Sequence, residues 1–153
     1  MDPLSVAASA IAFLQAAKAI GQGVKFIKSL KAAPAEFCDV LNELSTLHAL
    51  VIQLERILRL HDGATLIEQN GEPDSVVFMG QLTKSLASTT NSLESLVQKL
   101  RNSSRRSYDD NEHYIPRLRW HLEREAILRL RDDARQTREY ITTLIASLHL
   151  TQG

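Results

Sequence analysis

Apolar residues recur every three or four positions over four long segments of this chain, and this spacing is the strongest constraint on its fold. In the second segment, from about residue 34 to 61, these residues are Phe37, Leu41, Leu44, Leu47, Val51, Leu54 and Leu58. The spacing places all of them on one side of an α-helix, as a single buried stripe. Similar stripes run through residues 74–100 and 116–150, and an apolar segment occupies residues 3–31. The sequence therefore predicts an all-α protein.

The ends of these segments carry residues that start helices. Asp2 followed by Pro3 provides an N-cap and a first helical residue, Asp74 is the expected N-cap of the third helix, and Pro116 lies near the start of the fourth. Long helices with short connections fold back on one another. We therefore expect residues 1–153 to form one domain, an antiparallel bundle of four helices, or five if one long segment is split.

The fourth segment has an inner stripe of apolar residues. Its expected members are Leu118, Trp120, Leu122, Ile127, Leu130, Ala134, Ile141, Leu144 and Leu148. In the third segment Thr89 and Thr90 occupy the turn where a large apolar residue is missing. We expect both stripes to face one shared core.

The sequence contains none of the common catalytic or metal-binding motifs. Its five histidines are scattered, and HExxH, GxxxxGK[ST], GxGxxG and GxSxG are absent. His121 and Glu125 share a helix face, but two ligands do not make a metal site, and a solvated face is the simpler interpretation. The only cysteine, Cys38, is expected to be a small buried thiol, and it points to a reducing compartment. We therefore predict a protein that is not an enzyme and has no metal or cofactor.

The charged residues argue against nucleic acid as a partner. The chain has 18 basic and 18 acidic residues, so its formal net charge is zero. Many arginines of the fourth segment are expected to pair with acids four residues away, as Arg119–Glu123, Glu125–Arg129 and Arg135–Glu139. Such pairs are typical of a solvated helix face and interrupt any continuous basic surface. Zero net charge also removes a barrier to self-association.

The first segment has an unusual distribution of apolar residues. Its large apolar side chains cover almost the whole circumference of the expected helix: Leu4, Val6, Ile11, Phe13, Leu14 and Ile20. A helix that is apolar all round either lies in the centre of a bundle or can leave it for lipid or a partner. The uncharged run 3–17 is shorter than the roughly 20 residues of a membrane span. No basic region precedes it, so we expect neither a cleaved signal nor a constitutive span.

Lysines follow this apolar run. Residues 1–33 contain four lysines and one aspartate, and the lysines include Lys18, Lys25 and Lys28. Basic residues beside an apolar run are attracted to anionic lipid headgroups. Alternatively, the helix is buried in the bundle and its lysines interact with the carbonyl groups at its C-terminal end. The residues themselves leave both alternatives open.

Several stretches of the chain are similar to one known family. They are the opening MDPLSVAAS at residues 1–9, Val24-Lys25-Phe26-Ile27, Ala33-Pro34, Leu41-Asn42-Glu43-Leu44 and Arg117-Leu118-Arg119-Trp120. Together they resemble the HeLo-like N-terminal domain of fungal STAND (NOD-like) receptors, over nearly the whole chain. The resemblance implies a helical bundle that works with a nucleotide-binding receptor module, either C-terminal to it or on a separate chain.

The resemblance also implies a function. HeLo-like domains are regarded as non-enzymatic effectors of programmed cell death or incompatibility, which act by oligomerisation and by targeting the N-terminal helix to a membrane. Carried over, the candidate membrane-targeting residues are Leu4, Val6, Ile11, Phe13, Leu14 and Ile20, and the candidate headgroup-binding residues are Lys18, Lys25 and Lys28. The implied partners are further copies of the chain and an anionic membrane surface, and the implied location is the cytoplasm with recruitment to the plasma membrane. The alternative is an adaptor bundle that only binds proteins and keeps its first helix buried.

Overall fold

Four long α-helices contain almost all of the residues that the computed structural model describes, which are 3–31, 33–60, 73–106 and 113–152. They are α1 (Pro3–Lys28), α2 (Ala35–Leu60), α4 (Pro73–Ser103) and α5 (Arg117–Gln152). Side chains are described within 10–30, 33–59, 78–104 and 114–147. The all-α fold class predicted from the apolar spacing is confirmed.

The prolines mark the helix starts. α1 begins at Pro3, as predicted. α4 begins at Pro73, so Asp74 lies inside its first turn and is not its N-cap, contrary to the prediction. Before α5, the carbonyl oxygen of Pro116 accepts hydrogen bonds from the backbone N–H groups of Arg119 and Trp120, at 2.9 and 3.2 Å. Proline suits these positions because the first N–H groups of a helix have no partner inside it.

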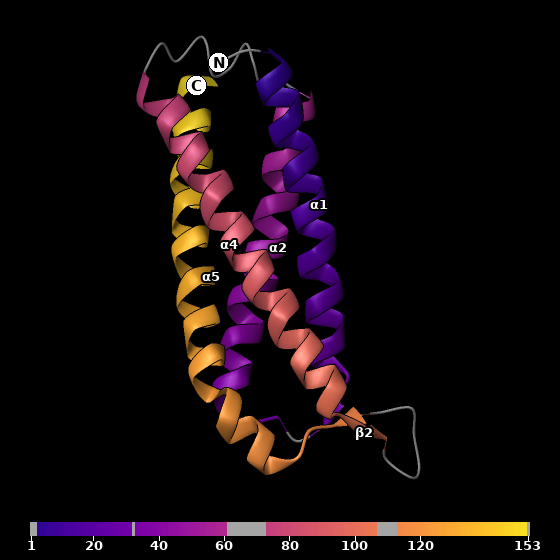
Figure 1. The fold of residues 1–153 in the computed structure, drawn as a ribbon. Coiled ribbons are helices and arrows are strands. Elements are labelled where there is room, and N and C mark those ends of the chain that lie inside the picture. The colour runs from indigo at the N-terminus through magenta and orange to yellow at the C-terminus, as the bar shows by residue number, and fades with distance from the viewer. Residues whose placement is uncertain (1–2, 32, 61–72, 107–112, 153) are drawn as a thin grey trace.

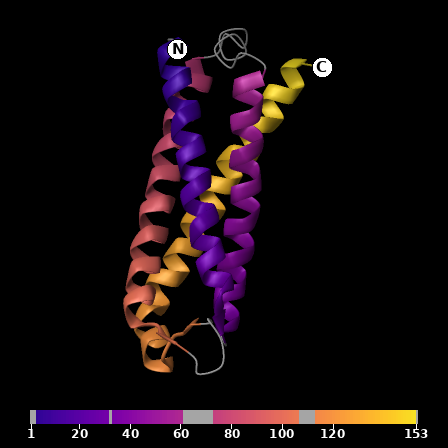
Figure 2. The same cartoon turned by 90° about the vertical axis from the view of Figure 1, so that its right-hand side faces the viewer.

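The helices form an elongated bundle in which each contacts two neighbours. α1 packs against α2 and α4, and α5 packs against the same two helices. α1 and α5 therefore occupy opposite corners. Each helix starts at the end of the molecule where the previous one finishes, so α1 descends from the N-terminus and α5 ascends to the C-terminus (Figures 1 and 2).

The core runs along the axis of the bundle and takes one face from each helix. Its largest fully buried side chains are Phe13, Ile20, Phe37, Leu44, Leu47, Leu54, Met79, Leu82, Leu93, Leu100, Leu130 and Ile141. The stripe predicted for the second segment is confirmed with one shift, because Val40 is buried and Leu41 only partly so. Near the start of α5, the rings of Phe37 and Trp120 pack edge to face, with centroids 4.6 Å apart.

Three two-residue strands close one end of the bundle. They are β1 (Leu30–Lys31), β2 (Arg105–Arg106) and β3 (His113–Tyr114). β3 lies in the middle, parallel to β1 and antiparallel to β2. The apolar spacing along the sequence predicted helices and no strands. These backbone pairs tie the end of α1 to the chain that leaves α4 and enters α5.

Candidate functional site

The two sides of α1 have different environments. Phe13 and Ile20 are completely buried, whereas Ile11 and Leu14 are 58% and 57% exposed. The predicted membrane-targeting residues are therefore divided between the core and the surface, and Phe13 and Ile20 can reach lipid only if α1 leaves the core. Leu4 and Val6 belong to α1, but their side chains lie outside the described part of the structure.

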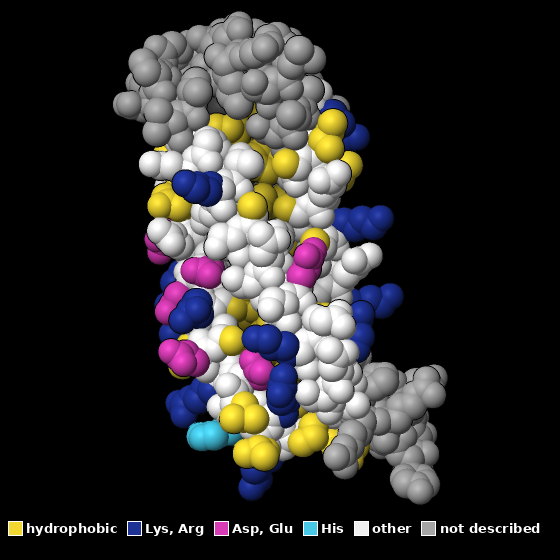
Figure 3. All heavy atoms as spheres, viewed as in Figure 1, with side chains coloured by type: hydrophobic (Ala, Val, Ile, Leu, Met, Phe, Trp, Pro, Cys, Tyr) yellow, Lys and Arg dark blue, Asp and Glu magenta, His cyan; other side chains and the backbone are white. Residues whose placement is uncertain are grey.

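The predicted headgroup-binding residues Lys18, Lys25 and Lys28 are all exposed. Because seven residues are close to two helical turns, Lys18 and Lys25 lie in line with Ile11. We call Ile11, Leu14, Lys18, Lys25 and Lys28 the outer stripe of α1. It is apolar toward the N-terminus and basic toward the C-terminus. Basic side chains project from the edge of the molecule that α1 forms (Figure 3).

A shallow groove separates α1 from α4 beside the outer stripe. It consists of two adjoining hollows of about 270 and 320 Å³ that share Ala19 and Glu94. The α1 side is lined mainly by small residues, which leave the space unfilled. At the lower end, the guanidinium group of Arg101 lies 5.0 Å from the centroid of the Phe26 ring. These linings contain no histidine or cysteine and only one carboxylate, so the groove offers no acid–base pair.

His121 of α5 and Cys38 of α2 both lie at the surface of the bundle. His121 and Glu125 are both exposed, and the described residues contain no group of three side chains suited to a metal ion. Cys38 is exposed, so the prediction of a buried thiol was wrong. It follows Phe37, which points into the core, and a helix turns by about 100° per residue. That turn directs the Cys38 thiol to solvent.

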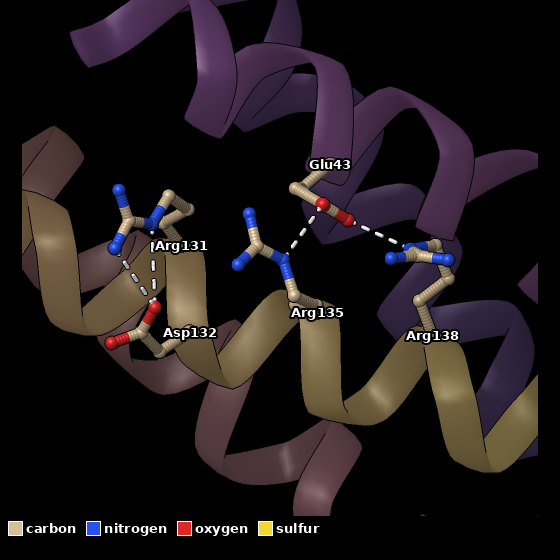
Figure 4. A network of polar contacts seen from close by, with 5 residues as sticks. All are labelled: Glu43, Arg131, Asp132, Arg135 and Arg138. Carbon is tan, nitrogen blue, oxygen red and sulfur yellow. Dashed lines mark hydrogen bonds and ion pairs between the residues drawn. The ribbon is translucent and has the colours of Figure 1, made fainter.

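Ion pairs of the described residues join α5 to α2. Glu43 accepts hydrogen bonds from Arg135 Nε at 3.1 Å and from Arg138 Nε at 2.7 Å (Figure 4). Arg135 was expected to pair with Glu139, but it lies on the flank of α5 that faces α2. Burial alone would raise the pKa of Glu43, but the hydrogen bonds and charges of Arg138 and Arg135 outweigh this effect and lower its pKa. This cluster fixes two helices to each other.

The other two expected ion pairs of α5 differ in outcome. Arg119 and Glu123 form theirs at 3.1 Å, as predicted. Glu125 and Arg129 make no ion pair in the described part of the chain. The carboxylate of Glu125 is therefore available at the surface of α5.

The start of α5 exposes two leucines that were predicted to belong to its inner stripe. Leu118 and Leu122 are 70% and 62% exposed, whereas Trp120 between them is buried. Side chains two residues apart on a helix point in directions that differ by about 200°. The two leucines must therefore face away from the side of the helix that Trp120 buries. Apolar side chains gather at the lower end of the molecule, where α5 begins (Figure 3). The helical period was therefore the sequence signal that separates Trp120 from the two leucines.

No family model matches this chain, and no curated protein or solved structure matches it either. Among the described helices, none combines the length and the apolar character needed to cross a membrane. The likeness to HeLo-like domains therefore stays a prediction from the sequence.

Proposed function

We propose that this chain is a non-enzymatic effector bundle that self-associates and contacts an anionic membrane surface through α1. One observation carries the membrane part of the proposal. Ile11 and Leu14 are exposed on the same outer stripe as Lys18 and Lys25. Apolar insertion and attraction of lysines to headgroups reinforce each other in peripheral membrane binding.

The outer stripe supports contact with a membrane while the bundle stays folded. Ile11 and Leu14 can enter the headgroup layer without movement of Phe13 or Ile20. Release of α1 would instead expose both buried side chains, at roughly 1.5–3 kcal/mol each. Surface contact is therefore the first step, and deeper insertion requires lipid to replace the core packing of α1.

The biological role rests on the resemblance to HeLo-like domains. It suggests programmed cell death or incompatibility as the process, and the cytoplasm with recruitment to the plasma membrane as the location. A nucleotide-binding receptor module, C-terminal or on a separate chain, is the corresponding partner. Of these parts, only the recruitment to the plasma membrane is tested by the experiment on membrane binding.

Vesicle co-sedimentation tests the membrane contact. We expect the chain to pellet with phosphatidylcholine vesicles that contain phosphatidylserine, and not with phosphatidylcholine alone. Leu14→Glu should abolish pelleting, because a carboxylate replaces an inserted apolar side chain and opposes the anionic surface. Ile52→Glu is the matched control, since Ile52 is a partly exposed apolar residue on α2. Helicity is checked for each variant by circular dichroism.

Two results would contradict the proposal. One is a folded chain that ignores anionic vesicles at every concentration tested. The other is an equal loss of pelleting in Leu14→Glu and Ile52→Glu, because binding would then depend on overall charge and not on α1.

A second candidate function is an adaptor that binds only proteins. The complete burial of Phe13 and Ile20 and the exposure of Leu118 and Leu122 favour it. This candidate predicts a folded chain without affinity for vesicles, in which Leu118→Glu weakens association between proteins.

A further inference from the structure

Two exposed stripes at opposite corners of the bundle carry complementary residues at the same spacing. On α1, an apolar residue is followed by two cations at intervals of seven: Ile11, Lys18 and Lys25. On α5, an apolar residue is followed by two anions at the same intervals: Leu118, Glu125 and Asp132. Since seven residues are nearly two helical turns, each set forms a line along its helix.

Both lines are accessible. Ile11 and Leu118 are 58% and 70% exposed. Lys18, Lys25 and Glu125 are exposed and form no ion pair with any described residue. Asp132 contacts Arg131 Nη2 at 3.2 Å, but its side chain is still 63% exposed. A second molecule can therefore reach all six side chains without unfolding the bundle.

We propose that the outer stripe of α1 is the docking surface for α5 of a second copy of this chain. In this contact the two helices run parallel, with Ile11 against Leu118, Lys18 against Glu125 and Lys25 against Asp132. Leu14 and Leu122 extend the apolar end. Matched opposite charges beside an apolar contact set the partner and the register, as they do between helices of a coiled coil.

The order of the residues also selects the direction of the two helices. In the antiparallel arrangement, Lys18 would still meet Glu125, but Ile11 would meet Asp132 and Lys25 would meet Leu118. Burying a charge against an apolar side chain is unfavourable. The parallel arrangement is therefore the one that matches all three of these pairs.

The position of the two stripes determines the kind of assembly. Because α1 and α5 occupy opposite corners, a copy that offers α1 to one neighbour still has α5 free for another. Such a heterologous contact does not stop at a dimer. Within one copy α1 and α5 run in opposite directions (Figure 1), so a parallel contact makes successive copies alternate in direction.

The same contact regulates membrane binding. It covers Ile11, Leu14 and Lys18, so a copy held by α5 of its neighbour cannot present these residues to lipid. This inference rests on the proposed function, since it names the partner that competes with the membrane for one surface. Self-association through this contact and vesicle binding should therefore oppose each other.

Sedimentation velocity without lipid tests the contact. The sedimentation coefficient of the native chain should rise with concentration. Lys18→Glu and Glu125→Lys should each weaken association by about tenfold or more, because each places like charges opposite one another. The double variant Lys18→Glu/Glu125→Lys should restore association. Asp39→Lys is the control for Glu125→Lys, because it makes the same charge change at an exposed position of α2. It should associate as the native chain does.

Vesicle binding by the same variants separates this inference from the proposed function. Glu125→Lys should bind anionic vesicles more strongly than Asp39→Lys, because its outer stripe is uncovered. The double variant should associate but lose vesicle binding. The proposed contact between α1 and α5 of two copies is contradicted if Glu125→Lys self-associates as the native chain does. It is also contradicted if the double variant folds without regaining association. If association follows the charges but no variant binds vesicles, the contact stands and the membrane function is wrong.

Discussion

Gly23 of α1 lies directly against the side chain of Leu93 of α4. A Cβ atom added at Gly23 would be 2.7 Å from Leu93 Cδ2 and 2.9 Å from its Cγ. Leu93 is completely buried, so a shift of its side chain would disturb the packing of the core. Glycine at this position therefore allows α1 and α4 to approach each other along the groove between them.

We expect Gly23→Ala to destabilise the bundle by about 1–2 kcal/mol. Overpacking a core costs roughly 1–3 kcal/mol, and the better helix propensity of alanine offsets up to about 1 kcal/mol of it. Urea unfolding followed by circular dichroism gives the free energy. The matched control is Gly80→Ala on α4, where an added Cβ meets nothing within 4 Å. That change should stabilise by roughly 0.5–1 kcal/mol, and equal effects of the two variants would contradict the close packing.

Neighbouring residues on α1 should respond very differently to truncation. Phe13 is completely buried and Leu14 is 57% exposed. Phe13→Ala should lower the free energy of unfolding by about 3–5 kcal/mol, because it leaves a cavity in the core. Leu14→Ala should change it by less than about 0.5 kcal/mol. Thermal unfolding of both variants measures the difference, and a similar loss in both would mean that α1 packs in another orientation.

The fold class follows from the sequence because helical spacing depends only on local order. Phe37, Leu44, Leu47 and Val51 lie on one side of any regular helix, and that side can only be the buried one. The three short strands could not be predicted in this way. They are two-residue backbone pairings that leave no pattern in the side chains, and the pairing of β1 with β3 joins segments far apart in the chain.

The candidate site was only partly predictable for a related reason. In α1, apolar residues occur on every side, so spacing alone cannot decide that Phe13 is buried and Ile11 exposed. The positions of α2 and α4 decide it. Glu43 is a similar case, because its partners Arg135 and Arg138 are more than ninety residues away, and within-helix spacing identifies only local partners.

A hydroxyl cluster with two completely buried threonines joins α4 to α5 where the apolar stripe of α4 is interrupted. Thr137 Oγ1 lies 2.6 Å from Ser85 Oγ and 2.9 Å from Thr89 Oγ1. Thr89 and Thr137 also donate to backbone carbonyl oxygens of their own helices, at 3.0 and 2.9 Å. The hydroxyl groups of Ser85, Thr89 and Thr137 therefore share three protons among four hydrogen-bond contacts. Removal of any one hydroxyl group changes the contacts of the other two.

We expect the threonines of this cluster to be energetically coupled. Thr89→Val and Thr137→Val should each cost about 1 kcal/mol, because each removes hydrogen bonds in the core. The double variant should cost less than the sum, since replacing both partners by apolar groups of the same shape leaves fewer unsatisfied groups. A double-mutant cycle by urea unfolding measures the coupling. Strict additivity would show that the two hydroxyl groups act independently.

The ion pairs of Glu43 should make the stability of the bundle depend on pH in the acid range. Although burial alone would raise the pKa of Glu43, Arg138 and Arg135 lower it below its ordinary value of 4.5. A carboxylate with a lowered pKa in the folded state stabilises the fold above its unfolded pKa, and this contribution is lost as the pH falls through the folded pKa. At pH 7, Glu43→Gln should therefore cost about 1–2 kcal/mol.

The difference between Glu43→Gln and the native chain should shrink as the pH falls below about 4.5, because protonation of Glu43 removes the charge that the variant lacks. Urea unfolding at a series of pH values from 7 to about 3 measures this difference. Glu139→Gln is the control, since Glu139 is exposed on the same helix as the arginines, and its effect at pH 7 should be within about 0.5 kcal/mol. A constant difference between Glu43→Gln and the native chain across the acid range would show that the charge of Glu43 does not hold α2 to α5.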